Sequence, residues 1–149
     1  MPTAGYSGTP LPRKLGIRAG HRVGLELPPS GFAATLGELP DGVRLVPASR
    51  EGDFDVLLLF VKDLKTLEAR LAGAIERMAP ETALWICWPK KTSPLAADVD
   101  ENKVRERGLA AGIVDVKVCA VDEDWSGHKF VFRLKDRPAR KMKKASEKK

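Results

Sequence analysis

The chain has 149 residues, 43% of them apolar, which suits one domain built around a single hydrophobic core. Its formal charge of +6 arises in residues 135–149, which hold 8 Lys/Arg and 2 acidic residues, so residues 1–134 are neutral and are not generally basic. No run approaches the roughly 18 apolar residues of a membrane span, and the first residues lack the apolar segment of a signal peptide. We therefore expect a cytoplasmic protein that does not enter a membrane.

The first half of the chain alternates short strands with one short helix. Residues 21–27 predict a strand, residues 32–39 a short helix, and residues 43–49 a weaker strand that contains Pro47. The strongest strand is "FDVLLLFV", residues 54–61. Its continuous apolar run predicts burial on both faces, as in a parallel sheet covered by helices.

A longer helix follows over residues 63–79, where apolar residues recur at three- and four-residue steps. Asp63 is positioned to cap its first turn. Residues 82–89, "TALWICWP", predict the next strand, and a second helix over residues 101–111 ends at Gly112.

The last two predicted strands, residues 114–122 and 125–134, are joined by a connection so short that they must form an antiparallel hairpin. The element order predicts an α/β three-layer sandwich with a mostly parallel sheet of about six strands, closed by this C-terminal hairpin. We expect residues 1–134 to form a single domain, with an irregular N-terminal arm over residues 1–14. Residues 135–149 have the composition of a basic disordered tail.

Three blocks of sequence resemble a known family of small bacterial proteins. The blocks "TAGYSGTPLPRKLGI", "LWICWPKKTS" and "GLAAGIVDVKVCAVDEDWSGHKFVFR" are similar to domain-of-unknown-function family 3052, a resemblance that brings no established activity. The element order also resembles a shortened class I methyltransferase, with its Rossmann-like fold and closing hairpin. That second resemblance implies a glycine-rich loop after the first strand that holds S-adenosylmethionine.

The loop at the corresponding place is "ELPPSG". Glu26 stands where that superfamily has an acidic residue, but Pro28 and Pro29 have no N–H to donate, and only Gly31 remains of the glycines. The resemblance also implies an acidic residue for the ribose after the second strand, where Glu51 comes late. We therefore expect no cofactor, with S-adenosylmethionine as the alternative.

A ligand site is expected beyond the carboxyl ends of the parallel strands, where open α/β sheets bind their ligands. Two indoles and two ammonium groups at that edge suit a flat or anionic ligand, and equally a protein partner. The candidate ligand-binding residues are Trp88, Lys90, Lys91, Asp122, Trp125, Ser126 and Tyr6. In the alternative interpretation, Trp85 and Trp88 cover helices and the two lysines are a solvated strand exit, whereas Trp125 is exposed in its turn.

The residues with reactive side chains do not define a catalytic site. Ser126, His128 and Asp122 are residue types of a hydrolase triad, but a triad depends on geometry and not on closeness in sequence. Cys87 and Cys119 lie in apolar runs without a CxxC pair, so we expect buried free thiols and no metal site. We assign no catalytic residue.

Taken together, these features favour a ligand- or protein-binding module on a degenerate methyltransferase-like scaffold over an enzyme. Two alternatives stay open: a divergent enzyme that uses S-adenosylmethionine or a nucleotide, and a nucleic-acid accessory protein that acts through residues 135–149. Such a basic tail can hold phosphates weakly. The expected partner is a small anionic or aromatic ligand or a protein, and a monomer is favoured.

Overall fold

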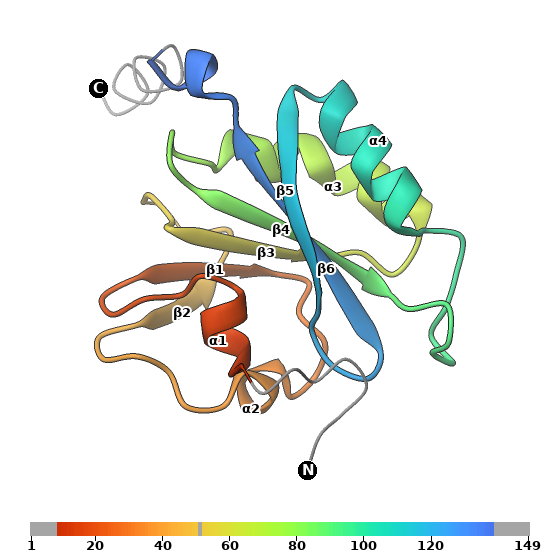
Figure 1. Cartoon of the computed structure of the whole chain (residues 1–149), viewed down its shortest axis with the longest axis horizontal. Coiled ribbons are helices and arrows are strands. Elements are labelled where there is room, and N and C mark those ends of the chain that lie inside the picture. The colour runs from red at the N-terminus through yellow and green to blue at the C-terminus, as the bar shows by residue number, and fades with distance from the viewer. Residues whose placement is uncertain (1–8, 51, 139–149) are drawn as a thin grey trace.

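The computed structural model describes residues 9–50 and 52–138. Within them a six-stranded sheet lies between two layers of helices (Figure 1). The strands are β1 (Arg22–Glu26), β2 (Arg44–Pro47), β3 (Val56–Phe60), β4 (Ala83–Pro89), β5 (Ile113–Ala120) and β6 (Trp125–Phe132). The helices are α1 (Leu11–Lys14), α2 (Phe32–Leu36), α3 (Leu64–Glu76) and α4 (Glu101–Ala110), followed by the 3-10 turn η1 (Leu134–Asp136).

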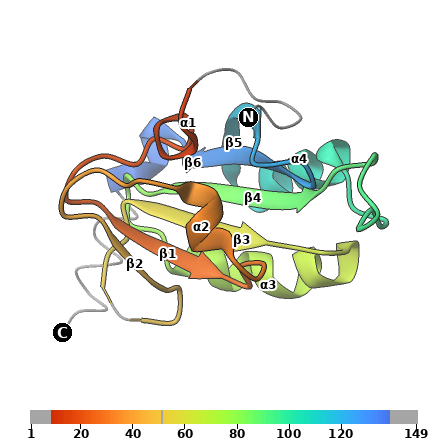
Figure 2. The ribbon, with the colours of Figure 1, turned by 90° about the horizontal axis from the view of Figure 1, so that it is seen from below.

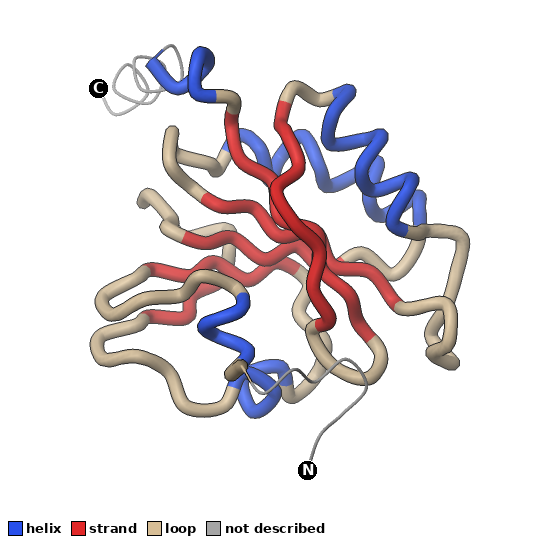
Figure 3. The backbone as a smooth tube through the Cα atoms, viewed as in Figure 1, coloured by secondary structure: helices blue, strands red, loops and turns tan. Residues whose placement is uncertain are grey.

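The strand order is β2-β1-β3-β4-β6-β5, which confirms the predicted α/β architecture (Figure 3). β1 to β4 are parallel, and β6 is antiparallel to both of its neighbours, β4 and β5. β2 and β5 are therefore the edge strands. The order reverses next to β1, because the chain goes from β1 to β2 on one side and then returns to β3 on the other. Such a reversal is a topological switch point, where the two connecting segments leave the sheet in opposite directions.

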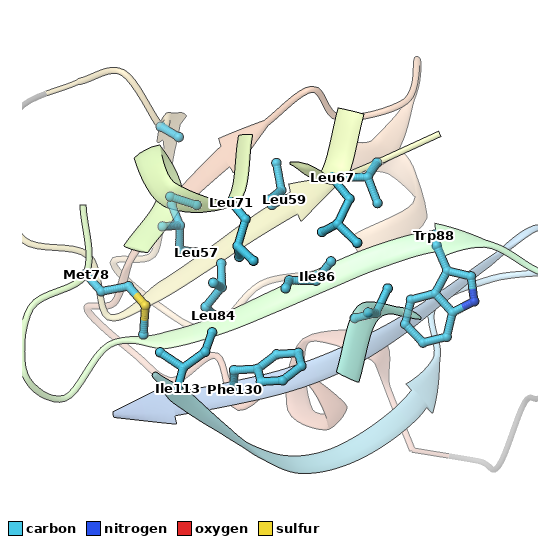
Figure 4. Close-up of a cluster of buried hydrophobic side chains, with 14 of the residues drawn as sticks. Leu57, Leu59, Leu67, Leu71, Met78, Leu84, Ile86, Trp88, Ile113 and Phe130 are labelled. Atoms are coloured by element: carbon cyan, nitrogen blue, oxygen red, sulfur yellow. The ribbon is translucent and has the colours of Figure 1, made fainter. Parts of the chain in front are cut away.

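The sheet separates two clusters of buried side chains. Leu57 and Leu59 of β3 face α3 and α4, whereas Leu58 and Phe60 face α1 and α2. Figure 2 shows α1 and α3 on opposite sides of the sheet, and Figure 4 shows the cluster on the α3 and α4 side. All five residues of β3 are buried, as the continuous apolar run predicts.

Helix α3 has the predicted stripe and the predicted cap. Leu67, Leu71 and Ala74 are buried against the sheet. The Asp63 carboxylate accepts hydrogen bonds from the Thr66 hydroxyl (2.6 Å) and the Thr66 N–H (2.8 Å), which lower the pKa of Asp63. The sequence therefore fixes both the start of this helix and the face that it buries.

The prediction of an irregular arm over residues 1–14 is wrong for its last four residues, which form α1. Its only buried residue, Pro12, lies in the first turn, where proline is compatible with a helix. The Trp85 indole N–H donates to the Leu15 carbonyl at 3.0 Å and ties the segment after α1 to the sheet.

The rest of the predicted arm, including Tyr6, and most of the predicted tail lie outside the described residues, so the domain boundaries stay a prediction. None of the helices in residues 9–50 and 52–138 is long and apolar enough to cross a membrane.

Candidate functional site

A crevice with a volume of about 520 Å³ lies at the carboxyl edge of the sheet, over the ends of β1 and β3. This is the topological switch point, where open α/β sheets bind ligands. The residues that line the crevice come from the ends of both strands, from α3 and from the start of β6: Leu27, Phe60, Lys62, Lys65, Thr66, Ala69, Arg70 and Trp125.

One wall of the crevice is aromatic. The Phe60 ring meets the Trp125 ring edge to face, with the centroids 5.3 Å apart, and contacts Phe32 in the same manner at 4.8 Å. Trp125 is only 8% exposed, so the expected exposure of this side chain is wrong. The packing holds both rings in place, and because Phe60 is 1% exposed and Trp125 8% exposed, they leave only a small apolar surface at the crevice.

A second wall of the crevice is cationic. Lys62, Lys65 and Arg70 line it, and no carboxylate is among the residues that line the crevice in the described part of the chain. The adjacent Asp63 carboxylate is directed to Thr66 as the helix cap. The wall therefore carries positive charge toward solvent and suits a carboxylate or phosphate group of a ligand.

The loop after β1 has an unusual backbone. Leu27 has φ 56°, and it is the only non-glycine residue with positive φ in the described ranges. A left-handed conformation costs a non-glycine residue roughly 1–2 kcal/mol, and such outliers gather at functional sites. Leu27 is 44% exposed and lines the crevice, so the strained backbone lies where a ligand would bind.

Glu26, which precedes Leu27, is at the end of β1 as expected. Its carboxylate is 3.2 Å from Arg77 and 3.5 Å from Arg70, and the side chain is 9% exposed. The pairing ties α3 to β1 and leaves Glu26 little capacity for a ligand. Arg70 is 51% exposed and keeps part of its guanidinium available to the crevice.

Four of the predicted site residues meet in a second hollow of about 360 Å³ on the α4 side of the sheet. Trp88, Lys90, Lys91 and Ser126 line it together with the first turn of α4. The Trp88 ring is 5% exposed and belongs to the buried cluster on this side (Figure 4), so its helix-covering role is confirmed.

The candidate ligand-binding residues do not form one site at the edge of the sheet. Trp125 and Ser126 are neighbours in β6 and point to opposite faces of the sheet. Trp125 therefore lies in the crevice, and Ser126 lies in the hollow.

Asp122 is a structural residue of the hairpin turn. Its carboxylate accepts hydrogen bonds from the N–H groups of Asp124 and Trp125, both at 2.8 Å. Asp124 in turn accepts the Lys90 N–H at its carbonyl and the Ser93 hydroxyl at its carboxylate. The turn is thereby fixed to the loop that follows β4, and Asp122 lines neither hollow.

His128 lies buried on β6 and forms no triad. Its Nε2 is 3.4 Å from the Asp115 carboxylate, its ring stacks on Phe130 at 4.7 Å, and no described residue bonds its Nδ1. Burial lowers the pKa of His128, and Asp115 opposes that shift. Its acidic partner is thus on β5 and not Asp122 in the turn.

The two thiols differ in accessibility. Cys87 is buried, and burial raises the pKa of its thiol well above the ordinary value. Cys119 is only half-buried, so the expectation of two buried thiols is wrong for this residue. In the sheet register Gly127 of β6 pairs with Cys87 on one side and with Cys119 on the other.

Most of the crevice was missed by the sequence analysis. Leu27 is the last residue of the first predicted strand and Lys62 follows the third, so applying the switch-point rule to these strand ends would have found both. Lys65 and Ala69, like Thr66 and Arg70, are four residues apart and share one face of α3. The sequence does not show how α3 lies across the sheet, so it could not show that this face lines the crevice.

The chain has a methyltransferase-like fold. The structure described as "DhpI-SAH complex structure" superposes with a TM-score of 0.56 and 12% identity, covering 84% of this chain and 83% of that chain. TrmN from Thermus thermophilus gives a TM-score of 0.50 and 16% identity, covering 83% of this chain and 47% of that chain. At such identities the likeness shows the fold alone.

The family described as "Protein of unknown function (DUF3052)" matches residues 38–134, and the chain belongs to this family. The resemblance in the sequence blocks is thereby confirmed. The comparison with curated proteins gives no match.

The expectation of no cofactor is corrected by the first of these structures, which is described as a complex with SAH on the same fold. The crevice fits such a group in a different manner from a glycine-rich loop, because Pro28 and Pro29 have no N–H to donate. The aromatic wall offers an apolar surface for the adenine, and Lys62, Lys65 and Arg70 offer donors for the carboxylate. Side chains of β3, α3 and β6 would thus hold the ligand.

Proposed function

We propose that the chain binds an S-adenosyl compound in the crevice between the ends of β1 and β3. The observation that carries the proposal is that the aromatic pair Phe60 and Trp125 and three cationic side chains line one crevice at the switch point. The likeness to the DhpI–SAH structure supports it. S-adenosylmethionine, when bound, supplies a methyl group for transfer, and this chain's residues bind and orient the ligand.

The charge of the crevice predicts which S-adenosyl compound binds more tightly. S-adenosylmethionine carries a positive sulfonium, whereas the sulfur of S-adenosylhomocysteine is neutral. One like-charge contact at 4 Å costs about 1 kcal/mol even with the full screening of water, so we expect S-adenosylhomocysteine to bind roughly fivefold more tightly. Titration calorimetry with both compounds measures the ratio, and equal or reversed affinities contradict this charge argument.

The proposal is tested by blocking the crevice from an exposed helix position. Ala69 lines the crevice, and Ala72 is an exposed residue one turn further along α3 that does not line it. We expect Ala69→Trp to abolish binding of S-adenosylhomocysteine and the matched variant Ala72→Trp to retain it. In a thermal shift assay, a ligand at 100 times its Kd adds roughly 2.7 kcal/mol of stability.

Both variants change exposed side chains, so each is expected to fold, which the unfolding transition without ligand verifies. The proposal is wrong if neither S-adenosyl compound raises the transition of the unaltered chain. It is also wrong if Ala69→Trp responds to the ligand as fully as Ala72→Trp does.

A further inference from the structure

A basic face lies on the α1 side of the hairpin, away from the crevice. It consists of Lys14, Arg18, Lys117 and Lys129. The register of the sheet places Lys129 of β6 between Trp85 of β4 and Lys117 of β5. Across these three strands, the fully buried indole of Trp85 is therefore followed by two neighbouring cations toward the edge of the sheet.

The two lysines oppose each other directly, and like charges at such a position destabilise a sheet. Arg18 adds a third positive charge: partial burial, and then the charges of Lys117 and Arg18, lower the pKa of Lys129. Within residues 9–50 and 52–138, none of the three forms an ion pair with a carboxylate. The fold thus tolerates a repulsion that one acidic neighbour would remove.

The surrounding groups add mostly positive charge to this face, although one carboxylate, that of Glu38, lines the same hollow as Arg18. The Lys14 ammonium donates to the Ala120 carbonyl at 3.0 Å, which places a fourth cation at the end of β5. Asp115 is the only acidic residue of β5, and its carboxylate pairs with His128 and Arg105 on the α4 side. A break in register between Asp115 and Lys117 separates the two residues onto different faces.

We propose that this basic face binds the phosphate backbone of a nucleic acid. A nucleic acid presents closely spaced anions in a regular row, so one strand can engage several of these cations together and release its counterions. Among the residues that the structure describes, the face has no exposed aromatic side chain beside the cations, since Trp85 is fully buried. That absence disfavours insertion into a membrane and predicts binding that does not depend on base sequence.

The test measures the affinity of the full chain for a fluorescent 20-nucleotide RNA by anisotropy over a series of salt concentrations. The double variant Lys117→Gln/Lys129→Gln removes two charges from the face. The matched control Arg44→Gln/Arg50→Gln removes two charges from exposed residues at and after β2, the opposite edge strand. We expect the first variant to bind at least tenfold more weakly, with a salt slope reduced by about two, and the control to bind like the unaltered chain.

The stability of the double variant is a second measurement. If the lysines had only a structural role, their replacement would not raise the stability. Removing the repulsion should raise the unfolding midpoint of Lys117→Gln/Lys129→Gln while its RNA affinity falls. The proposal is overturned if both double variants lose RNA equally, or if neither loses it. It is also overturned if the unaltered chain ignores RNA but binds vesicles of anionic lipid through the same two lysines.

Discussion

At the scale of single residues, two helix glycines predict opposite effects of the same substitution. A Cβ atom at Gly108 of α4 would lie 2.8 Å from Phe130 Cζ and closer still to Cε2, whereas at Gly73 of α3 it would meet only the flexible end of Arg77 at 3.5 Å. We expect Gly108→Ala to lower the free energy of unfolding by about 1–3 kcal/mol through overpacking. Gly73→Ala should raise it by up to about 1 kcal/mol through helix propensity.

Urea unfolding of both variants measures the two effects. If Gly108→Ala proves stabilising, α4 cannot be packed against Phe130 as closely as described.

His128 predicts a pH dependence of stability. Because burial lowers its pKa in the folded protein below the ordinary 6.5, the unfolded chain binds this proton more readily. The stabilising contribution of the neutral imidazole is complete above pH 6.5 and is lost as the pH falls toward the lowered pKa. We expect His128→Phe to flatten the fall in unfolding midpoint below pH 6.5.

The control for this effect is His21→Gln, since His21 is the other histidine of the chain. That variant should keep the slope of the unaltered protein. An unchanged slope in His128→Phe would assign the acid sensitivity to other groups.

The alternative interpretation, in which Trp85 and Trp88 cover helices, is confirmed, because both lie on a strand whose two faces alternate with period two. Trp125 could not be placed in the same way. Its burial depends on the Phe60 ring, which is 65 residues earlier in the sequence and reaches it only through the sheet. The crevice was missed for the same reason.

At the scale of elements, strong local signals gave the right structure. The apolar run of β3 and the stripe of α3 with its Asp63 cap both appear as predicted. The four-residue helix α1 was missed because it is shorter than the interval over which helical periodicity can be detected. Helix propensity also cannot predict where α1 lies against the sheet, because its position depends on the hydrogen bond from the Trp85 indole to the Leu15 carbonyl.

The start of α4 offers a test of one capping residue. Asp100 accepts the Lys103 N–H at 2.9 Å through its side chain. Replacing it by alanine leaves this N–H without its partner, so we expect Asp100→Ala to lower the free energy of unfolding by about 1 kcal/mol. Asp100→Asn should retain most of the stability, because asparagine caps equally well. Equal losses in both variants, measured by urea unfolding, would show that charge and not capping matters at this position.

At the scale of the whole molecule, the two functional surfaces lie over different strands of the sheet. The crevice opens at the carboxyl edge over β1 and β3, whereas the basic face lies over the hairpin of β5 and β6. Binding at one surface requires no change at the other. Ala69→Trp should therefore keep the RNA affinity of the unaltered chain, and Lys117→Gln/Lys129→Gln should keep its response to S-adenosylhomocysteine. The two proposals can fail independently.

The position of Gly127 between Cys87 and Cys119 also decides how the protein responds to oxidation. Neighbouring strands are about 4.8 Å apart, so the two cysteine Cα atoms, one strand removed from each other, are separated by roughly 10 Å. A disulfide requires less than about 7 Å, and an intact sheet therefore prevents a bond within the chain. We expect the same unfolding midpoint with and without a reductant, measured by circular dichroism; a lower midpoint in reductant would contradict this arrangement. The stability of the fold therefore does not depend on a disulfide between these two cysteines, whether its surroundings are oxidising or reducing.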